Sequence, residues 1–410
     1  MFDYIEARAA SNSNIAQHAA FGPLSVAIRA DDGRWTLLID ETGAHLSRGE
    51  CRAEITLSAT SAAWAELRKP EPQPGFQTLT TMRRTQNLII TGDMVKFHQH
   101  LLLLEMLFSN LSPDEQPTPS PPTVPEIEPV IGRYLRLAIN GRPHRVYFEE
   151  AGEGVPLICL HTAGSDGRQF RHVLNDPAVT ANYRVIAFDL PWHGKSSPPA
   201  GFEAEVYELT IDSYMDIVMA VVDALKLDRP AVMGCSIGGR AVLHLAIRHG
   251  DRFRAAIGLQ SALYAEDRSI GDPAPRNVLH RPDIHGGKTA GASMAGMIAP
   301  QSPSEERWET MWHYMQGGPG IFAGDLVYYF EDGDLRNGLA EPLRNSACPI
   351  YLLSGDYDPS ATPEMGQELA DLINATYFEV MRGVGHFPMS ENHAAFREYL
   401  LPVLEKVRAQ

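Results

Sequence analysis

Several kinds of sequence feature are scarce in this chain, and cysteine is the first of them. Its 410 residues include 4 Cys, and no two of these form a C-x-x-C pair. The cysteines are Cys51, Cys159, Cys235 and Cys348. Such usage predicts neither a disulfide framework nor a thiolate metal site, and it favours a reducing, cytoplasmic location.

Positive charge and long apolar runs are scarce as well. The chain has 35 Lys and Arg against 51 Asp and Glu, which gives a net charge of −16. Nucleic acids and anionic membranes attract basic surfaces, so neither is an expected partner. No run approaches the ~18 apolar residues that a membrane span needs. Residues 1–6 carry acidic side chains rather than the apolar core of a signal peptide.

What the chain does contain is a serine between glycines. Residues 234–238 read Gly-Cys-Ser-Ile-Gly, after an apolar run at 230–233 and before a helical pattern at 240–248. A strand that turns sharply into a helix presents the hydroxyl of such a serine, here Ser236, for nucleophilic attack. The pattern also fits a plain strand-to-helix turn with a capping serine. The catalytic interpretation therefore requires an acid and a histidine later in the chain.

An acid follows in the required order. A short apolar strand is predicted at 349–354, and it runs into a turn at 355–359 that is rich in Asp, Gly and Pro. We expect Asp358 to be the acid of the site. Asp356 lies in the same turn and is the alternative, but it directly follows a glycine and is expected to shape the turn.

A histidine follows the next predicted strand, at 376–380. We expect His386 to accept the proton of the Ser236 hydroxyl, while the acid fixes its tautomer and stabilises the imidazolium. His393 is the alternative base. It stands at the start of the helix predicted for 394–407 and has the character of a surface residue.

A hydrolytic serine also needs amide groups that stabilise an oxyanion. A strand predicted at 157–160 ends in the small-residue loop 161–167. One donor is expected to be the amide of Ile237, the residue after the nucleophile. The second is expected from the loop, either from Ala163 or, as the alternative, from Thr162.

From about residue 133 to the C-terminus, the chain resembles the α/β-hydrolase fold superfamily. The matching segments are residues 161–164 (His-Thr-Ala-Gly), 188–196 (Phe-Asp-Leu-Pro-Trp-His-Gly-Lys-Ser), 234–239, 355–358 and 385–387. The resemblance implies an α/β fold with a mostly parallel, eight-stranded sheet. Many members have glycine where this chain has Thr162, which leaves the second oxyanion donor open. The expected nucleophile is a serine, whereas haloalkane dehalogenases and epoxide hydrolases of this superfamily use an aspartate. The sequence therefore argues against these two branches.

The domain organisation can be predicted from composition. A proline-rich linker at 111–130 separates residues 1–110 from the hydrolase, whose core is expected at 131–260 and 346–410. Residues 1–110 resemble the sterol carrier protein 2-like fold, a small α+β domain. The resemblance rests on Ala-Glu-Ile-Thr-Leu-Ser at 53–58, on Trp64, and on Leu-Ile-Ile-Thr-Gly-Asp at 88–93 before a final helix. It implies an apolar ligand pocket, a structural role or a homodimer contact.

Residues 261–345 are too long for a plain loop and are expected to form a cap over the serine. Substrate contacts are expected from His161, Trp192, Trp312 and Tyr329. His280 and His285 have no third ligand at a suitable spacing, so no metal is expected. No dinucleotide cofactor is expected either, because G-x-G-x-x-G is absent.

Together these features predict an enzyme that hydrolyses a carboxylic ester, lactone or thioester of a small, largely apolar molecule through Ser236, His386 and Asp358. A first alternative is a C–C bond hydrolase with the same triad. A second is a lipid-binding or scaffold protein that has kept the triad without using it. A fold resemblance alone does not choose among them.

Overall fold

The computed structural model describes residues 2–11, 21–49, 51–111, 127–265, 281, 283–336 and 338–410. These form two compact units. The first comprises Met1–Thr123 and Arg268–Glu305, and the second comprises Val124–Asp267 and Glu306–Gln410. Most of the linker predicted at 111–130 lies outside the described residues, as does His280. Part of the segment predicted as a cap therefore belongs to the first unit.

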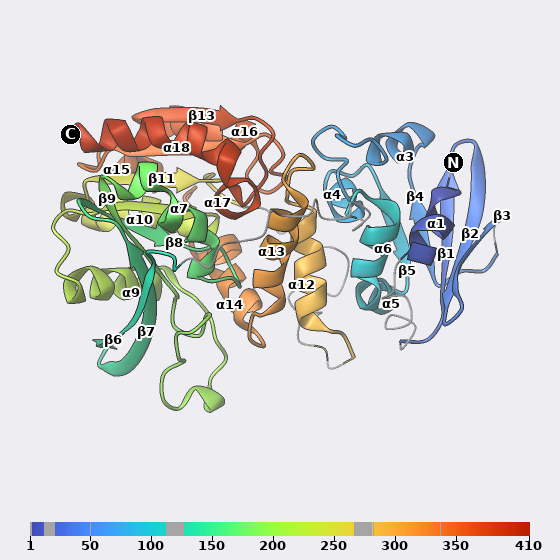
Figure 1. Ribbon diagram of the computed structural model, residues 1–410, viewed down its shortest axis with the longest axis horizontal. Coiled ribbons are helices and arrows are strands. Elements are labelled where there is room, and N and C mark those ends of the chain that lie inside the picture. Colours follow the sequence, from blue (N-terminus) through green and yellow to red (C-terminus); the bar gives the residue numbers. More distant parts are fainter. Residues whose placement is uncertain are drawn as a thin grey trace. The chain divides into compact units, whose positions relative to one another are not determined.

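The first unit is built on a five-stranded sheet of order β3-β2-β1-β4-β5 (Figure 1). Its strands are β1 (Leu24–Ala30), β2 (Gly33–Asp40), β3 (Gly43–Arg48), β4 (Ile55–Ser58) and β5 (Ile89–Gly92). Its helices are α1 (Tyr4–Ser11), α3 (Ser61–Leu67), α4 (Leu79–Arg84), α5 (Met94–Gln99), α6 (Leu101–Phe108) and α12 (Gly286–Ala295). Strand β1 pairs antiparallel with β2 and parallel with β4.

Several of these elements differ from the sequence-based expectation. The final helix that was expected after residues 88–93 is divided into α5 and α6 at His100, whose backbone leaves the helical region. Strands β1 and β3 were not expected. Strand β3 is short and mostly polar, so it carries no apolar run that would reveal it.

Helix α12 joins the core of the first unit although it is distant in the sequence. It packs against α6, and Ala292 is fully buried in the same apolar cluster as Phe2, Trp64 and Phe108. The inserted segment thus completes the hydrophobic core of this unit. Removal of the N-terminal residues would leave α12 without its partner helix.

Glu105 is a fully buried carboxyl group in this core. It lies on α6 and accepts hydrogen bonds from the amides of Leu79 at 3.0 Å and Thr80 at 2.9 Å. Burial raises the pKa of Glu105 to about 7, against the two amides, which lower it. The carboxyl group therefore gains a proton in the folded protein at a higher pH than in the unfolded chain.

This shift predicts a pH-dependent stability of the first unit. Because the folded-state pKa is raised, the contribution of Glu105 is fully present below about pH 4.5 and is lost as the pH rises through about 7. We expect a loss on the order of 3 kcal/mol in the free energy of unfolding. Hydrogen exchange at the α6 amides between pH 5 and 8 measures it. In Glu105→Gln, the free energy of opening measured by exchange should depend less on pH. An unchanged dependence would assign the effect to another titrating group.

The second unit is built on an eight-stranded sheet of order β13-β12-β11-β10-β8-β9-β7-β6. The strands are β6 (Ile131–Ile139), β7 (Arg142–Ala151), β8 (Val155–Leu160), β9 (Tyr183–Phe188), β10 (Ala231–Cys235), β11 (Ala255–Leu259), β12 (Ile350–Gly355) and β13 (Tyr377–Met381). The sheet is mixed. Strands β8 to β13 are parallel, whereas β6 and β7 are antiparallel additions at one edge.

Helices cover both faces of this sheet. They are α7 (Arg171–Asn175), α8 (Pro177–Thr180), α9 (Ile211–Ala224), α10 (Ile237–His249), α13 (Ser304–Met315), α14 (Ile321–Val327), α15 (Ala340–Arg344), α16 (Pro363–Ile373), α17 (Pro388–Glu391) and α18 (His393–Arg408). Short turns of other helix types are η2 (Gly167–Phe170), η3 (Phe202–Ala204), η4 (Gly250–Arg252) and the π-helical η5 (Tyr328–Asp332). Among the described residues, no helix has both the length and the hydropathy of a bilayer-spanning segment.

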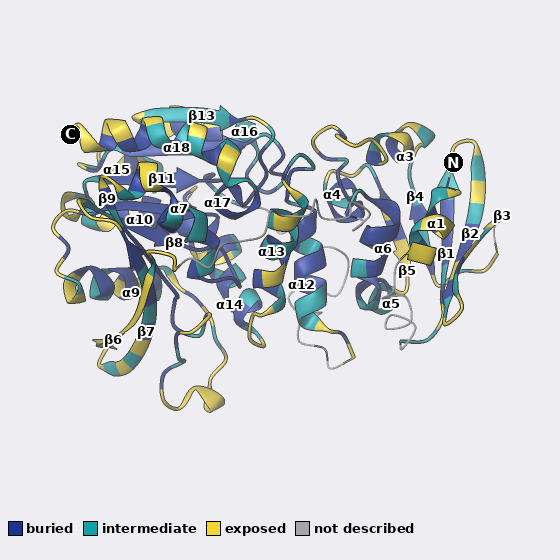
Figure 2. Cartoon of the chain, viewed as in Figure 1, coloured by how far each residue is buried: buried dark blue, intermediate teal, exposed yellow. Residues whose placement is uncertain are grey.

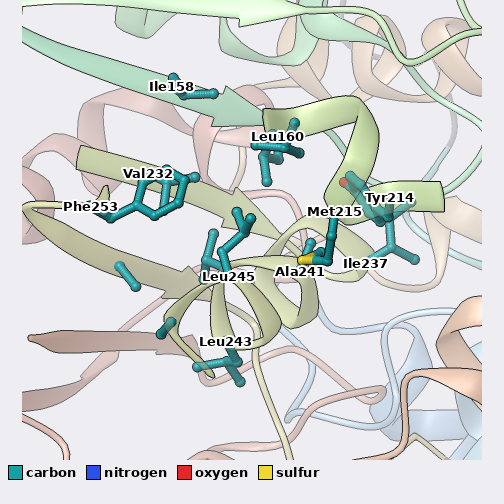
Figure 3. Packing of buried hydrophobic residues seen from close by; sticks show 14 of the residues in the cluster. Ile158, Leu160, Tyr214, Met215, Val232, Ile237, Ala241, Leu243, Leu245 and Phe253 are labelled. Atoms are coloured by element: carbon teal, nitrogen blue, oxygen red, sulfur yellow. The ribbon is translucent and has the colours of Figure 1, made fainter. Parts of the chain in front are cut away.

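Alternating residues of the central strands face two different apolar clusters. Ile158 and Val232 belong to the cluster that includes α9, α10 and α16, and Figure 3 labels both among the buried side chains of this cluster, together with Ala241 and Leu245 of α10. Their neighbours in sequence instead face the cluster that includes α7, α8 and α18. In Figure 2 the central strands are buried, whereas α18 alternates between buried and exposed residues. This alternation is the expected pattern of a sheet buried on both faces.

The parallel strands place four loops at one edge of the sheet. Strands β8, β10, β12 and β13 all run in the same direction, so the loops after their carboxyl ends meet there. These are the loops that carry the predicted oxyanion residues, Ser236, Asp358 and His386. Ligand sites of open α/β sheets form at this edge.

Candidate active site

Ser236 lies at the sharp turn between β10 and α10. Its backbone has a φ of 58° and a ψ of −114°, in the positive-φ region that non-glycine residues avoid. A Cβ at Gly234 would lie 2.4 Å from the backbone of Gly238, and a Cβ at Gly238 would lie 2.4 Å from the carbonyl oxygen of Leu160. Both glycines are therefore required by close backbone packing. A strained turn of this kind is typical of functional sites.

Asp358 and His386 form a buried pair. His386 Nδ1 lies 2.7 Å from Asp358 Oδ2, and both side chains are at most 3% exposed. The other oxygen of Asp358 accepts a hydrogen bond from the amide of Ser360 at 2.7 Å. Asp356 instead accepts from the amide of Gly383 at 2.8 Å. The structure thus pairs Asp358 with the histidine, while Asp356 shapes the loop.

His393, the alternative base, is paired elsewhere. Its Nε2 lies 3.1 Å from Asp176 Oδ2, and Arg397 binds the same carboxylate at 3.0 Å. Burial lowers the pKa of His393, against the hydrogen bond to Asp176, which raises it. This histidine belongs to a contact between α18 and the start of α8.

Cys235, the residue before Ser236, connects the end of β10 to the loop that carries His386. Cys235 Sγ donates to the carbonyl oxygen of His386 at 3.0 Å, which holds the His386 backbone against the end of β10. Among the described residues, no hydrogen bond joins the side chains of Ser236 and His386. The hydroxyl of Tyr329 lies near the side chain of Ser236, which lowers the pKa of Tyr329.

Tyr329 reaches the serine from the π-helical turn η5. Its hydroxyl lies near the side chains of Ser360 and Ser236, and the guanidinium carbon of Arg240 lies 5.4 Å from its ring centre. Burial raises the pKa of Tyr329, while the Arg240 charge and the two serines lower it. Single π-helical turns often occur at functional sites. Of the predicted substrate residues, Tyr329 is the one whose hydroxyl lies near Ser236.

Two buried side chains that the sequence did not reveal hold the histidine loop. Gln260 accepts from the amide of Gly355 at 2.9 Å and donates to the carbonyl oxygen of Gly385. Glu391 accepts from the amides on both sides of His386, at 2.5 Å from Gly385 and 3.1 Å from Phe387. Both side chains are fully buried. Neither residue lies in a recognisable motif. The available signal for Gln260 was that a polar residue directly follows the apolar strand that ends at Leu259.

The amides of the predicted oxyanion loop differ in whether they have an acceptor. The amide and hydroxyl of Thr162 both donate to Gln169 Oε1 at 3.0 Å. The amide of Gly164 donates to Asp325 Oδ2 at 2.7 Å. Within the described part of the chain, we find no acceptor for the amide of Ala163. Ile237 is the first residue of α10, where a helix leaves amides unpaired.

The other predicted contact residues lie in different surroundings. His161 is buried, accepts from the Leu190 amide at 3.1 Å and hydrogen-bonds to the carbonyl oxygen of Thr162 at 2.9 Å. Burial, together with the nearby His193, lowers the pKa of His161 to about 4, so its ring is neutral. Trp192 packs against the rings of Phe202 and Tyr207. Trp312 is 54% exposed.

Of the two histidines considered at positions 280 and 285, the structure describes only His285. His285 caps α12 by accepting from the amide of Lys288 at 3.2 Å. His280 lies outside the described residues. No group of three potential metal ligands is found among those that are described.

Known proteins resemble this chain in sequence and in fold. Residues 155–393 match the family model described as alpha/beta hydrolase fold. The 2-hydroxymuconate semialdehyde hydrolase of Pseudomonas sp. (strain CF600) is 32% identical over 141 residues, which cover 34% of this chain and 46% of that protein. The match to this relative therefore spans less than half of its length.

Solved structures share the architecture. A thermophilic esterase from Thermogutta terrifontis matches with a TM-score of 0.56 and 19% identity, over 67% of this chain and 99% of that chain. An enzyme described as degrading N-acyl homoserine lactones matches with a TM-score of 0.52 and 26% identity, over 65% of this chain and 98% of that chain.

Proposed function

Because the chain belongs to the alpha/beta hydrolase fold family, we propose that it is a serine hydrolase of carboxylic ester, lactone or thioester bonds in a small, largely apolar molecule. The observation that carries the proposal is the 2.7 Å contact between His386 Nδ1 and Asp358 Oδ2. This contact orients the imidazole and leaves Nε2 for proton transfer. The strained turn at Ser236 lies beside it.

The mechanism follows from these positions. Ser236 Oγ attacks the carbonyl carbon and transfers its proton to His386 Nε2. The amides of Ile237 and Ala163 stabilise the oxyanion that forms. His386 then returns the proton to the leaving alcohol, lactone oxygen or thiol, which departs from the acyl-enzyme. A water molecule, deprotonated by His386, cleaves the acyl-enzyme and restores Ser236.

Several contacts support these assignments. The amide of Thr162 is occupied by Gln169, which favours Ala163 as the loop donor. A Ser–His contact that tightens only with bound substrate is common in such enzymes. Tyr329 lies beside Ser236 and is the strongest candidate for a substrate contact. The exposure of Trp312 argues against a role for its ring in a closed pocket.

A C–C bond hydrolase is the second candidate, and a named relative favours it. The 2-hydroxymuconate semialdehyde hydrolase is 32% identical to this chain over the 141 residues that match. The same serine, histidine and acid can serve both reactions. The substrate therefore has to be determined by experiment.

A paired substrate assay distinguishes the candidates. The full chain is incubated with nitrophenyl esters of short acids and, separately, with a 2-hydroxy-6-oxo dienoic acid. We expect the esters to be cleaved with a kcat/KM of about 10⁴ M⁻¹s⁻¹ or more, and the dienoic acid to be cleaved far more slowly. Preference for the dienoic acid would support the C–C hydrolase. Failure of both, with no labelling of Ser236 by a fluorophosphonate, would support a non-catalytic scaffold.

We also propose that the first unit has a sterol carrier protein 2-like fold. Its support is the sequence pattern around 53–58 and 88–93, which forms the adjacent antiparallel strands β4 and β5. A role in binding an apolar ligand or in forming a homodimer stays a prediction. Sedimentation of the full chain over a range of concentrations tests the second role.

A further inference from the structure

A buried ionic cluster lies next to the loop that would supply the second oxyanion donor. At its centre is Asp325 on α14, which is fully buried. Its Oδ2 accepts from the amide of Gly164 at 2.7 Å and lies 2.9 Å from His193 Nε2. Its Oδ1 accepts from the hydroxyl of Tyr207 at 2.8 Å. Neither a triad role nor a substrate contact accounts for this arrangement.

The protonation of the cluster follows from its partners. His193 Nδ1 lies 3.0 Å from the carbonyl oxygen of Pro191, which can only accept a hydrogen bond. Its Nε2 faces the carboxylate of Asp325, which also accepts. Burial lowers the pKa of His193, but the charge and hydrogen bond of Asp325, the hydrogen bond to Pro191 and the charge of Asp189 together raise it above its ordinary value. Both ring nitrogens of His193 thus face acceptors, which is the arrangement of a cationic imidazole paired with the Asp325 carboxylate.

A second contact from the segment between β11 and β12 holds the other side of the loop. The hydroxyl of Tyr314, on α13, bonds to Thr162 Oγ1. Thr162 in turn donates its hydroxyl and its amide to Gln169. Phe322 of α14 packs so closely on Gly164 that a Cβ there would lie 2.7 Å from its ring. The residues on both sides of Ala163 are thus fixed, and its own amide is left without an acceptor among the described residues.

We propose that Asp325 is a positioning residue for oxyanion stabilisation, which holds the 162–164 backbone so that the amide of Ala163 can donate to the reacting oxygen. Tyr314 acts in the same way through Thr162. Residues of α13 and α14 thereby complete the catalytic geometry. This inference rests on the proposed serine hydrolase function.

The test uses fluorophosphonate labelling of Ser236, because it needs no knowledge of the substrate. We expect Asp325→Asn to lower the second-order labelling rate constant by a factor on the order of 10², since a small misplacement of a catalytic group has effects of this size. Tyr314→Phe should lower it severalfold. For any ester that the enzyme cleaves, kcat should fall while KM stays nearly unchanged.

Asp176→Asn is the matched control. Asp176 also binds a histidine and accepts a backbone amide, from Ala178 at 2.9 Å, but it lies in the contact with α18. It should label at the wild-type rate. Circular dichroism shows whether Asp325→Asn is folded. If it is not, the test uses Tyr314→Phe and the double variant Asp325→Asn/His193→Gln. The double variant leaves no unpaired buried charge.

The outcomes separate this inference from the proposed function. If the wild-type protein is labelled, and folded Asp325→Asn and Tyr314→Phe are labelled at the same rate, the positioning role is overturned. The proposed hydrolase function would then still stand. A wild-type protein that is not labelled at Ser236 would overturn the hydrolase proposal and this inference with it. A slow Asp176→Asn would show that loss of any buried carboxylate has the same effect, which also contradicts a specific role for Asp325.

Discussion

Ser236→Ala should abolish turnover of every ester that the wild-type enzyme cleaves. Without the hydroxyl no acyl-enzyme can form, and we expect kcat to fall by a factor on the order of 10⁶, as in a well-studied serine protease. The fold should be retained, because alanine removes one oxygen and keeps the Cβ that already occupies the turn. Steady-state kinetics, together with mass spectrometry of the fluorophosphonate adduct, measures both consequences.

A buried serine outside the site provides the control for this variant. Ser390 is fully buried and accepts a hydrogen bond from Thr310 at 3.0 Å, so Ser390→Ala removes a hydroxyl of similar burial. We expect it to lower stability by about 1 kcal/mol and to leave kcat within severalfold of the wild type. Retention of most ester turnover by Ser236→Ala would show that a different group is the nucleophile.

Much of the site could be predicted because its parts lie in short segments with strong local requirements. The turn at Ser236 excludes a Cβ at Gly234 and Gly238, which is why the pattern is visible in the sequence. Strands β10, β12 and β13 are apolar runs that end in polar loops. The match to the alpha/beta hydrolase fold family over residues 155–393 confirms the predicted fold of this part.

The remaining contacts depend on side chains that meet only after folding. Gln260 holds the histidine loop from a distant segment and Glu391 from the short helix that follows this loop, and no motif marks either role. Asp325 lies in a segment with no motif, and its partners Gly164 and His193 are more than a hundred positions away. Local patterns carry no information about such pairings, because burial and charge compensation are properties of the folded chain.

The sequence also did not show which residues belong to which of the two units. Residues 261–345 were expected to form a cap as a whole, whereas Arg268–Glu305 belongs to the first unit. The small residues of α12 allow it to approach α6 closely, as the full burial of Ala292 indicates. A run of Gly, Ala and Ser fits many environments, so its partner could not be chosen from composition.

Asp358→Asn is the variant with the second largest expected effect, and Asp356→Asn is its matched control. Asparagine at 358 keeps the shape of the side chain, but its amide group can donate to His386 Nδ1 and so favours the wrong tautomer. We expect kcat to fall by a factor on the order of 10⁴. Asp356 lies in the same turn and accepts the Gly383 amide at 2.8 Å, so its replacement should cost stability and little activity.

The comparison of these two variants tests the acid directly, because both remove one negative charge from the same turn. Steady-state kinetics at pH 7 gives the two losses in kcat, and thermal unfolding gives the two losses in stability. A general disturbance of the loop would lower kcat similarly in both. A larger loss in Asp356→Asn would transfer the acid role to Asp356, in conflict with the 2.7 Å contact between Asp358 and His386. A large loss confined to Asp358→Asn requires that the charge act through the imidazole, which is the relation that the buried pair predicts.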